Sequence, residues 1–547
     1  MDRNVFPYFS ASIPALSCYL PPLYLFTDTF VLPKFYLLLL SVGCTGIWVA
    51  LAKGRGWGLP PLNDSLQKGG VLYVAVSVLE CLYVLGLMVN EGFPQRGVCG
   101  TFENPAGLAL NLCVAIPIAI EMLIGRWRLG KGKRKAELAL WLLAIVLMAT
   151  VLVFTRSRTG LICLSFFLVV YACRGIHRLV CKRSVRKWLY GVAVVSVSAI
   201  LVLLVCFHKE DSTSGRAFIL GRTCELVKEH PLVGHGAGGF EREYMLRQAA
   251  YFKEHPDSEF ALLADDIRHP LNEFLLLWVD YGVLGPVLLL AVLAAPLWMV
   301  FSMRGKRRLG GKNGKADVGE SEKRHESMEV LSLPMVAVFV FSCLSYPFHY
   351  PAAWLVVGCA LLTLAAKHVR MLLNERSRKT IAYMVLFAGV AVLALTINDA
   401  VHEYRWNRAY RHSFRERAAL EEYERLHGYF ASNPYFLYSY AMASFKRGDL
   451  DRASRMIEEC GKYRSGYNRE LLAADICFYK KNYAEAAAHY ELASRMCPVR
   501  FAPLEGLYKV HEATGDTLRR DEVARRIAQK QVKVQSRDVK RIKKRCQ

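Results

Sequence analysis

The sequence lacks the residue patterns of several common functional sites. Its 16 cysteines form no Cys-x-x-Cys pair and no zinc-like spacing with histidine. Most of them lie within apolar runs, so we interpret them as small buried hydrophobic side chains. A cleavable signal peptide is not visible either, because the first apolar run has no basic segment before it and no small-residue cleavage site after it. We expect this run to stay in place as an anchor.

A nucleotide-binding loop is also lacking. The glycine-rich stretch from His230 to Phe240 has no strand pattern before it and no Lys-Ser or Lys-Thr pair of a P-loop. Its proline and glycines instead predict a tight turn after a helix over 222–229. We expect the backbone of this turn to pack closely against membrane helices.

Long apolar runs are what the sequence does contain. Of the 547 residues, 53% are hydrophobic and the net charge is +24, a combination that is unusual for a soluble domain. Apolar runs recur as far as residue 397, and they predict an all-α, polytopic transmembrane domain over 1–400 with about 11 spans. The predicted spans lie near 9–26, 31–51, 71–90, 105–124, 137–155, 159–174, 188–207, 284–302, 330–347, 351–367 and 380–397.

Basic residues cluster in every second connection between these spans, namely 52–69, 126–135, 174–187, 304–324 and 367–379. By the positive-inside rule, these connections face the cytoplasm, together with the N-terminus. The connections 27–30, 91–104, 155–158, 208–283 and 348–350 then lie outside, as does the C-terminal domain. Membrane orientation accounts for the basic excess, so we predict no nucleic-acid partner.

A second, α-helical domain is predicted over 401–535. Two stretches, 445–453 and 478–486, align at about the tetratricopeptide period, and a weaker third copy begins at Ala513. The concave surface of such repeats usually binds a protein or an extended chain, while the alternative here is a purely structural helical cap. The chain after Val532, including a basic tail over 536–547, has few apolar residues, and we expect it to be frayed or disordered.

Arg156 and Arg158 stand in a very short outer connection between two predicted spans. Charges at such a depth are costly and tend to be functional. The planar guanidinium group binds phosphate oxygens at two points, so the pair suits a pyrophosphate at the membrane surface. The alternative is that both side chains simply extend to the interface from a helix end.

The long outer loop over 208–283 ends in an apolar stretch with Trp278, which predicts a helix in the membrane interface. His269 stands at the start of this stretch. A neutral imidazole there could take the proton from an acceptor hydroxyl, although capping or packing is an alternative role. Several carboxylates suggest a metal site as a further alternative, but their charge-rich surroundings favour solvated side chains, and we predict no metal. They are Asp28, Asp257, Glu259, Asp265 and Asp266.

Four motifs together resemble the O-antigen ligase and polymerase superfamily. In chain order they are Gly100-Thr-Phe-Glu-Asn-Pro-Ala-Gly107, Arg156-Ser-Arg-Thr-Gly160, Ser214-Gly-Arg216 with the stretch Glu229 to Gly236, and the stretch Asn272 to Gly285. The order of the motifs and the long outer loop between two spans also agree with this family. The resemblance is close over about residues 70–300, and the C-terminal repeats look like those of a subgroup with a tetratricopeptide tail.

This resemblance implies a multi-pass glycosyltransferase of the bacterial inner membrane that uses no metal or other cofactor. Members of the family move a glycan from undecaprenyl pyrophosphate, within membrane lipid, to a lipid A core, another glycan or a protein hydroxyl. By resemblance, Arg158 and Arg216 bind the pyrophosphate and stabilise its charge as it leaves, and Arg156 supports them.

The family commonly has a His-Asn pair at the start of its last motif, with the histidine as the base. Here Leu271 stands directly before Asn272, so the base is His269 reaching from upstream, or else another histidine. The candidate catalytic residues are therefore His269, Arg158 and Arg216, and the candidate substrate-binding residues are Arg156, Arg222, Asn272, His235 and His349.

Several functions stay open at this point. A ligase, a polymerase and a protein O-oligosaccharyltransferase would share these motifs, and a repeat domain modestly favours a large or protein acceptor. A flippase for lipid-linked glycan is the alternative from another class, and it should show internal repeats or broken helices at the bilayer midplane. A scaffold that acts through its repeat domain is a further alternative.

Overall fold

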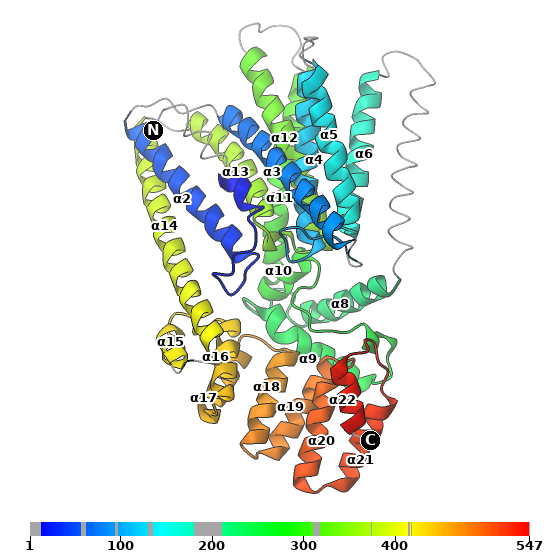
Figure 1. The fold of residues 1–547 in the computed structure, drawn as a ribbon. Coiled ribbons are helices and arrows are strands. Elements are labelled where there is room, and N and C mark those ends of the chain that lie inside the picture. Colours follow the sequence, from blue (N-terminus) through cyan, green and yellow to red (C-terminus); the bar gives the residue numbers. More distant parts are fainter. Residues whose placement is uncertain are drawn as a thin grey trace. The chain divides into compact units, whose positions relative to one another are not determined.

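The computed structural model describes residues 13–55, 62–92, 94, 97–128, 135–179, 210–309, 318–372, 375–413, 416 and 418–545. All regular secondary structure in these residues is helical, which confirms the predicted all-α fold class. The chain divides into two compact units (Figure 1). The first unit comprises Met1–His208 and Leu288–Val401, and the second comprises Lys209–Val287 and His402–Gln547.

Long apolar helices build the first unit. They are α2 (Leu32–Gly54), α3 (Leu62–Glu91), α4 (Pro105–Arg128), α5 (Lys135–Phe154), α6 (Arg158–Leu179), α11 (Leu284–Leu309), α12 (Val318–Leu344), α13 (Pro351–Leu372) and α14 (Glu375–His412). Among the described residues, five helices are long and apolar enough to cross a membrane, and they lie in α2, α3, α4, α5 and α14. Shorter apolar stretches lie in α6, α11, α12 and α13. These nine stretches coincide with predicted spans, and the chain is a multi-pass membrane protein.

The first predicted span, 9–26, is wrong in its second half. The described helix there ends at residue 17, and turns and bends follow as far as residue 31. Pro21 and Pro22 lack the N–H groups that a helix needs. The Asp28 carboxylate then accepts hydrogen bonds from the N–H groups of Phe30 and Val31, which fixes the turn before α2. The predicted span 188–207 lies outside the described residues.

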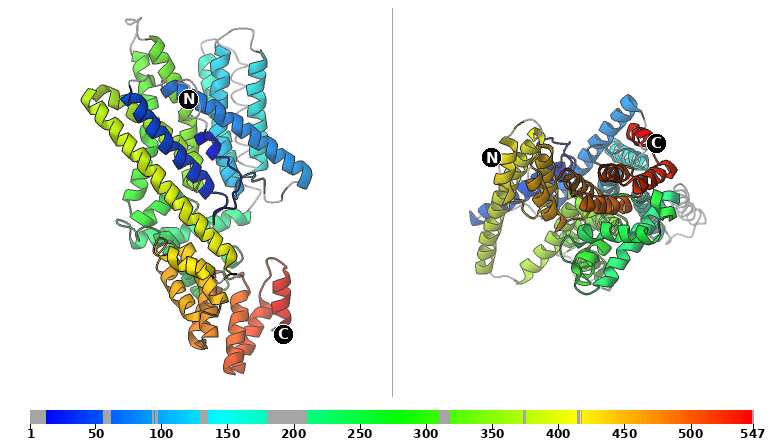
Figure 2. Two further views of the ribbon diagram at one scale, coloured as in Figure 1. Left: turned by 60° about the vertical axis from the view of Figure 1, so that its left-hand side comes forward. Right: turned by 90° about the horizontal axis from the view of Figure 1, so that it is seen from below.

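Helix α4 is the centre of the first unit, with α3, α5, α6, α12 and α13 packed around it. Of its apolar stretch, 78% is buried, compared with 17% for α5 and 11% for α14. Helices α2 and α14 lie side by side (Figure 2), and a Cβ atom at Gly43 of α2 would lie only 3.0 Å from the Gly389 carbonyl oxygen of α14. Such small-residue contacts let membrane helices approach closely.

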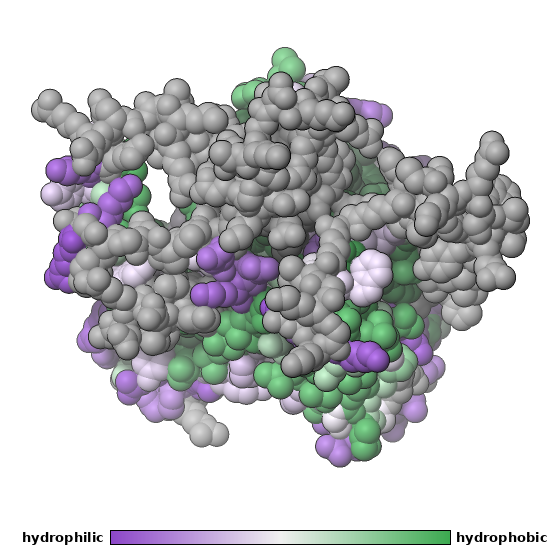
Figure 3. Space-filling model, turned by 90° about the horizontal axis from the view of Figure 1, so that it is seen from above, coloured by the Kyte–Doolittle hydropathy of each residue, from purple (hydrophilic) through white to green (hydrophobic). Residues whose placement is uncertain are grey.

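Many apolar side chains on the outer helices are exposed, as lipid-facing residues would be. On α14 they include Tyr383, Phe387 and Leu395, each of which is more than two-thirds exposed, and on α5 they include Leu140 and Leu143. Exposed hydrophobic residues are also visible as green areas in the space-filling view of Figure 3. An exposed apolar surface of this kind requires an apolar solvent.

The second unit combines the predicted outer loop with the C-terminal helices. The loop forms α8 (Glu210–Glu229), α9 (Gly239–Glu254), a short 3-10 helix η1 (Glu259–Leu262) and α10 (Glu273–Tyr281). The C-terminal part forms α15 (Ala418–His427), α16 (Pro434–Lys446), α17 (Leu450–Gly461), α18 (Tyr467–Tyr479), α19 (Tyr483–Met496), α20 (Ala502–Thr514), α21 (Thr517–Gln529) and α22 (Arg537–Arg545).

Helices α16 to α21 form three consecutive pairs, α16 with α17, α18 with α19, and α20 with α21. We call them the C-terminal helix pairs. Ala453 and Ala486, the small residues of the aligned stretches, are fully buried where helices approach each other. Asp449 and Asp516 cap the second helix of the first and third pair through their carboxylates. The helical content agrees with the expected repeats, while the tetratricopeptide assignment stays a prediction.

The basic end of the chain is more ordered than the sequence indicated. Residues Arg537–Arg545 form α22 instead of a frayed segment. Ile542 is buried against Val523 and Ile527 of α21, and Val539 packs beside it. Two apolar residues one helical turn apart are enough to attach this short helix to the preceding pair.

Candidate functional site

The turn between α5 and α6 carries the two arginines of the Arg-Ser-Arg motif. Thr155 is buried, and its hydroxyl donates to the Leu152 carbonyl at 2.6 Å. Arg156 follows in the left-handed region with φ of 53°, and its side chain is exposed. Arg158 is the first residue of α6 and is half-buried. A cation at a helix N-terminus is disfavoured by the helix dipole. An anion bound there would be stabilised both by the arginine charge and by the dipole.

The predicted outer connections of the first unit meet at one end of it. The N–H group of Val98 donates to the Phe154 carbonyl at 3.2 Å, so residues 97–98 touch the end of α5. Glu103 lies 3.2 Å from the Nε2 atom of His349, which stands in the short 3-10 helix η2 (Pro347–His349). The structure therefore brings His349 to the connection that precedes α4, as the alternating topology requires.

Asn104 organises this end of the first unit. Its Oδ1 atom accepts hydrogen bonds from the N–H groups of Ala106 and Gly107 and thereby caps α4. Its Nδ2 group donates to the hydroxyl oxygens of Tyr350 at 2.7 Å and Tyr346 at 3.1 Å. A single side chain thus fixes both the start of α4 and the two tyrosines that flank His349.

Two buried charged residues bind the backbone of the connection that precedes α4. The Nζ atom of Lys34 in α2 donates to the Thr101 carbonyl at 2.8 Å and lies 3.6 Å from the centre of the Phe102 ring. The Glu80 carboxylate in α3 accepts from the Thr101 N–H group at 2.7 Å. Glycine is favoured at position 100, because its φ of 59° is left-handed and a Cβ atom would lie 2.1 Å from this carboxylate. The sequence reasoning missed both residues, although charges inside predicted spans were the signal that could have revealed them.

In the second unit, α10 begins directly after Asn272, the first residue of the last motif. Asn272 is the N-cap, and its side chain accepts from the Leu275 N–H group at 3.0 Å. Leu271 before it adopts φ of 58°, a left-handed conformation that is rare for a bulky residue. His269 is half-buried in the non-helical stretch just upstream. The structure gives Asn272 a capping role, and His269 precedes it by three residues in the chain.

The glycine-rich turn, residues 230–240, packs against the C-terminal end of α10. The N–H groups of His235 and Gly236 donate to the carbonyls of Val279 and Asp280, at 2.7 and 2.9 Å. Close backbone packing was expected, but the partner is α10 and not one of the long apolar helices. Alternating glycines allow this approach because three of them adopt positive φ angles.

His235 contributes mainly to this packing. Its Nε2 atom lies 3.0 Å from the Leu226 carbonyl at the end of α8, and its ring contacts that of His230. The Arg242 guanidinium donates to the His235 carbonyl. These contacts hold the turn to α8 and α9.

Asp280 is a further residue that the sequence reasoning missed. Its carboxylate accepts from the N–H groups of Phe240 at 2.9 Å and Gly238 at 3.3 Å, and so caps α9. Burial raises the pKa of the Asp280 carboxyl, and the two backbone donors only partly offset this effect. It thus joins the end of α10 to the start of α9.

The loop arginines lie on α8. Arg222 pairs with Glu225 at 2.9 Å, and its guanidinium carbon lies 4.5 Å from the centre of the Tyr251 ring. These partners give Arg222 a packing role within the loop. Arg216 lies nearly two turns earlier and is half-buried.

Two of the carboxylates considered for a metal site form ion pairs with arginines. Asp265 pairs with Arg500 at 2.6 Å, and Asp266 lies 3.7 Å from Arg464. Within the part of the chain that the structure describes, no group of three or more His, Cys, Asp or Glu side chains could hold a metal ion.

Comparison with protein families shows that most of these residues lie within one matched domain. A family model described as O-Antigen ligase matches residues 143–290. The chain carries an O-antigen ligase domain. This domain extends from α5 through α6, the outer loop and α10 to the start of α11. No curated protein matches the chain at a significant level.

The O-antigen ligase domain contains almost the whole candidate site. Seven of the eight candidate residues fall within the matched stretch, and His349 is the exception. The first unit holds Arg156, Arg158 and His349, and the second unit holds the others. An O-antigen ligase or polymerase type of function, and hence a membrane enzyme that acts on lipid-linked glycans, follows from this domain.

Proposed function

We propose that the protein transfers a glycan from undecaprenyl pyrophosphate to a periplasmic acceptor hydroxyl, on a lipid A core or a similar glycolipid, at the outer face of the bacterial inner membrane. The observation that carries this proposal is the coincidence of the O-antigen ligase domain with Arg156, Arg158, Arg216 and His269. Two of these arginines flank a helix start that favours an anion.

The reaction proposed is a single displacement at the anomeric carbon. The acceptor oxygen forms the new bond, the bond to the pyrophosphate oxygen breaks, and undecaprenyl pyrophosphate leaves with the electron pair. Configuration at the anomeric carbon is inverted. Arg158 and Arg216 stabilise the negative charge that develops on the leaving group, with Arg156 in support, and no metal ion is required.

The base that accepts the hydroxyl proton is proposed to be His269. It stands three residues before the N-cap of α10, close to the family's histidine position. His349 is the second candidate, because Glu103 at 3.2 Å can orient its ring. His235 is a weaker candidate, since its ring nitrogen already contacts the Leu226 carbonyl.

The experiment uses the purified full-length chain in liposomes with a radiolabelled undecaprenyl-pyrophosphate glycan. Three acceptors are offered separately: lipid A core, a second lipid-linked glycan, and a protein with accessible serine and threonine residues. Label on lipid A core supports the ligase, whereas label on either other acceptor identifies a polymerase or a protein O-oligosaccharyltransferase. Movement of the donor between leaflets without any new glycosidic product would replace the proposal with a flippase.

A further inference from the structure

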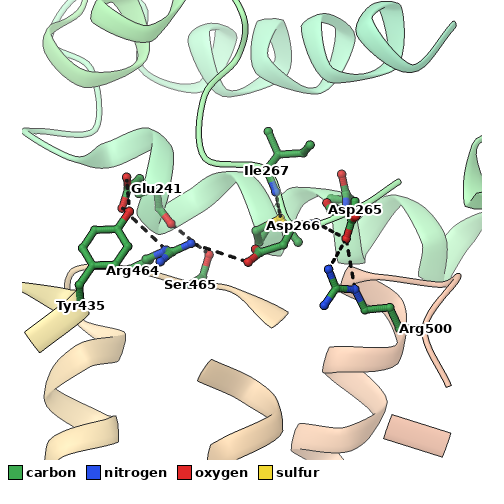
Figure 4. A network of polar contacts seen from close by, with 10 residues as sticks. Glu241, Asp265, Asp266, Ile267, Tyr435, Arg464, Ser465 and Arg500 are labelled. Carbon is green, nitrogen blue, oxygen red and sulfur yellow. Dashed lines mark hydrogen bonds and ion pairs between the residues drawn. The ribbon is translucent and has the colours of Figure 1, made fainter. Parts of the chain in front are cut away.

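The non-helical stretch between η1 and α10, residues 263–272, runs along the turns that join the C-terminal helix pairs. Arg500, after α19, donates from Nη2 to the Asp265 carboxylate at 2.6 Å and from Nε at 3.2 Å. Arg464, between α17 and α18, lies 3.7 Å from Asp266 (Figure 4). Two successive carboxylates of the loop are therefore held by two successive turns of the helix pairs.

Helix α9 of the loop is attached to the turn between α17 and α18 and to the first turn of α16. The Ser465 N–H group donates to the Glu241 carbonyl at 3.1 Å. The Glu241 carboxylate accepts from the Tyr435 hydroxyl at 3.1 Å and lies 3.8 Å from Arg464 (Figure 4). Arg464 is mostly buried and stacks its guanidinium over the Tyr435 ring, so it is shared between α9 and the stretch that follows η1.

Gln248 links α9 both to the stretch 263–272 and to the C-terminal helix pairs. This α9 side chain is fully buried, and its Nε2 group donates to the Met496 carbonyl at 2.6 Å and to the Asp265 carbonyl at 3.1 Å. An apolar cluster also joins the loop to the helix pairs. The cluster contains Leu226, Phe240, Tyr244, Met245, Ala249 and Val279 from the loop, and Tyr467, Ala493, Met496 and Cys497 from the helix pairs.

The chain that follows the stretch 263–272 is also fixed, at the C-terminal end of α10. Asp280 caps α9 through its carboxylate, and the Trp278 indole donates to the Pro231 carbonyl at 2.9 Å. The segment from Asp265 to Asp280 is thus held at one end by the helix pairs and at the other by the glycine-rich turn. His269 lies within it, four residues after Asp265.

We propose that the C-terminal helix pairs are a positioning domain for this segment of the O-antigen ligase domain. Gln248, Arg464 and Arg500 act as positioning residues that hold the backbone leading to His269. The inference rests on the proposed function, because it assigns the positioned segment to the transfer reaction. In the turns at 464–467 and 496–500, Arg464, Ser465 and Arg500 are already in contact with the chain's own loop.

The test compares Arg500→Ala, the double variant Arg464→Ala with Arg500→Ala, and the charge-exchanged variant Asp265→Arg with Arg500→Asp. Arg526→Ala is the matched control, because Arg526 makes a similar ion pair with Glu491 at 2.9 Å between two C-terminal helices and does not touch the loop. Each full-length variant is assayed for kcat and for the KM of donor and acceptor. Hydrogen exchange is measured over 263–272 and over α18 to α20.

We expect the double variant to lose about 10- to 100-fold in kcat, since small displacements of a catalytic group cost this much. The KM for the donor should stay within about twofold. Exchange over 263–272 should rise while α18 to α20 stay protected, the charge-exchanged variant should recover most of the loss of Arg500→Ala, and Arg526→Ala should behave like wild type.

Unchanged hydrogen exchange over 263–272 in the double variant would show that Arg464 and Arg500 do not hold this stretch, whatever the transfer rate. Raised exchange with an unchanged kcat would overturn the positioning role and leave only a structural contact. A failure of wild type to transfer glycan would instead overturn the proposed function. The exchange comparison would still decide whether the helix pairs hold residues 263–272 in place.

Discussion

Gly282 and Leu232 lie so close together that a Cβ atom at Gly282 would stand 2.0 Å from the Leu232 carbonyl oxygen. Gly282 also has φ of 64°. We predict that Gly282→Ala destabilises the contact between α10 and the glycine-rich turn by about 2–4 kcal/mol. Hydrogen exchange over 231–282 measures this effect.

Gly236→Ala is the control for that substitution. Gly236 has φ of 87°, but a Cβ atom added there would meet no other atom within 4 Å. Only the backbone cost of about 1–2 kcal/mol therefore applies. Equal effects of the two substitutions would contradict the close packing of α10 against the turn.

Acid should weaken the second helix pair through Glu470. Burial alone would raise the pKa of this carboxyl, but the hydrogen bond with His489 at 2.7 Å and the adjacent Arg469 hold the pKa below its usual value of 4.5. A depressed carboxyl pKa contributes stability above about pH 4.5, and this contribution is lost as the pH falls through the folded-state pKa.

Glu470→Gln should therefore remove part of the acid sensitivity of α18 and α19. The measurement is hydrogen exchange of these two helices in wild type and variant between about pH 6 and pH 3, the range over which carboxyls titrate. A variant that loses protection with falling pH as steeply as wild type would show that another group is responsible.

Asn104 should show two separable roles. Asn104→Ala removes the cap of α4 and should cost about 1 kcal/mol, whereas Asn104→Ser keeps a capping hydroxyl but is too short to reach Tyr346 and Tyr350. We expect exchange of the Ala106 N–H group to rise only in Asn104→Ala, and mobility of residues 346–350 to rise in both. Identical behaviour of the two variants at Ala106 would argue against the cap.

The base can be identified from pH profiles. His269→Ala should lower kcat by about 10²- to 10⁴-fold and remove the acidic limb of the pH–rate profile, because a general base must be unprotonated to act. His349→Ala should lower kcat less and keep that limb, since His349 is the second candidate beside Glu103. The reverse pattern would transfer the role to His349.

Much of the first unit could be predicted from hydropathy and charge, because long apolar helices and alternating basic connections leave a direct trace in the sequence. The segment around Pro21 and Pro22 was missed because apolar content alone does not show that two prolines and the Asp28 turn end the helix. Lys34 and Glu80 are visible in the sequence as charges inside predicted spans, but their shared partner, the Thr101 backbone, is not, because no side-chain pattern reveals it.

The candidate site could be predicted only as a set of motifs. Asn272 was recognised as part of a motif, but its capping of α10 and the left-handed Leu271 depend on backbone geometry. The contact between Gln248 and Met496 joins residues 248 positions apart. An amphipathic pattern shows that a helix has a buried face but not which distant segment covers it, so the packing of the loop on the helix pairs was not foreseen.

The most direct test of the account is the rate of glycan transfer from undecaprenyl pyrophosphate to lipid A core by wild type, Arg158→Ala, Arg158→Lys and Arg216→Ala in liposomes. Arg126→Ala serves as the control, because Arg126 pairs with Glu137 at 3.3 Å at the other end of α4. The account predicts losses of about 10²- to 10³-fold in both alanine variants. Arg158→Lys should recover only part of the loss, since an ammonium cannot bind phosphate at two points, and the control should match wild type. Transfer at the wild-type rate by both Arg158→Ala and Arg216→Ala would contradict the pyrophosphate-binding role on which the proposed mechanism depends.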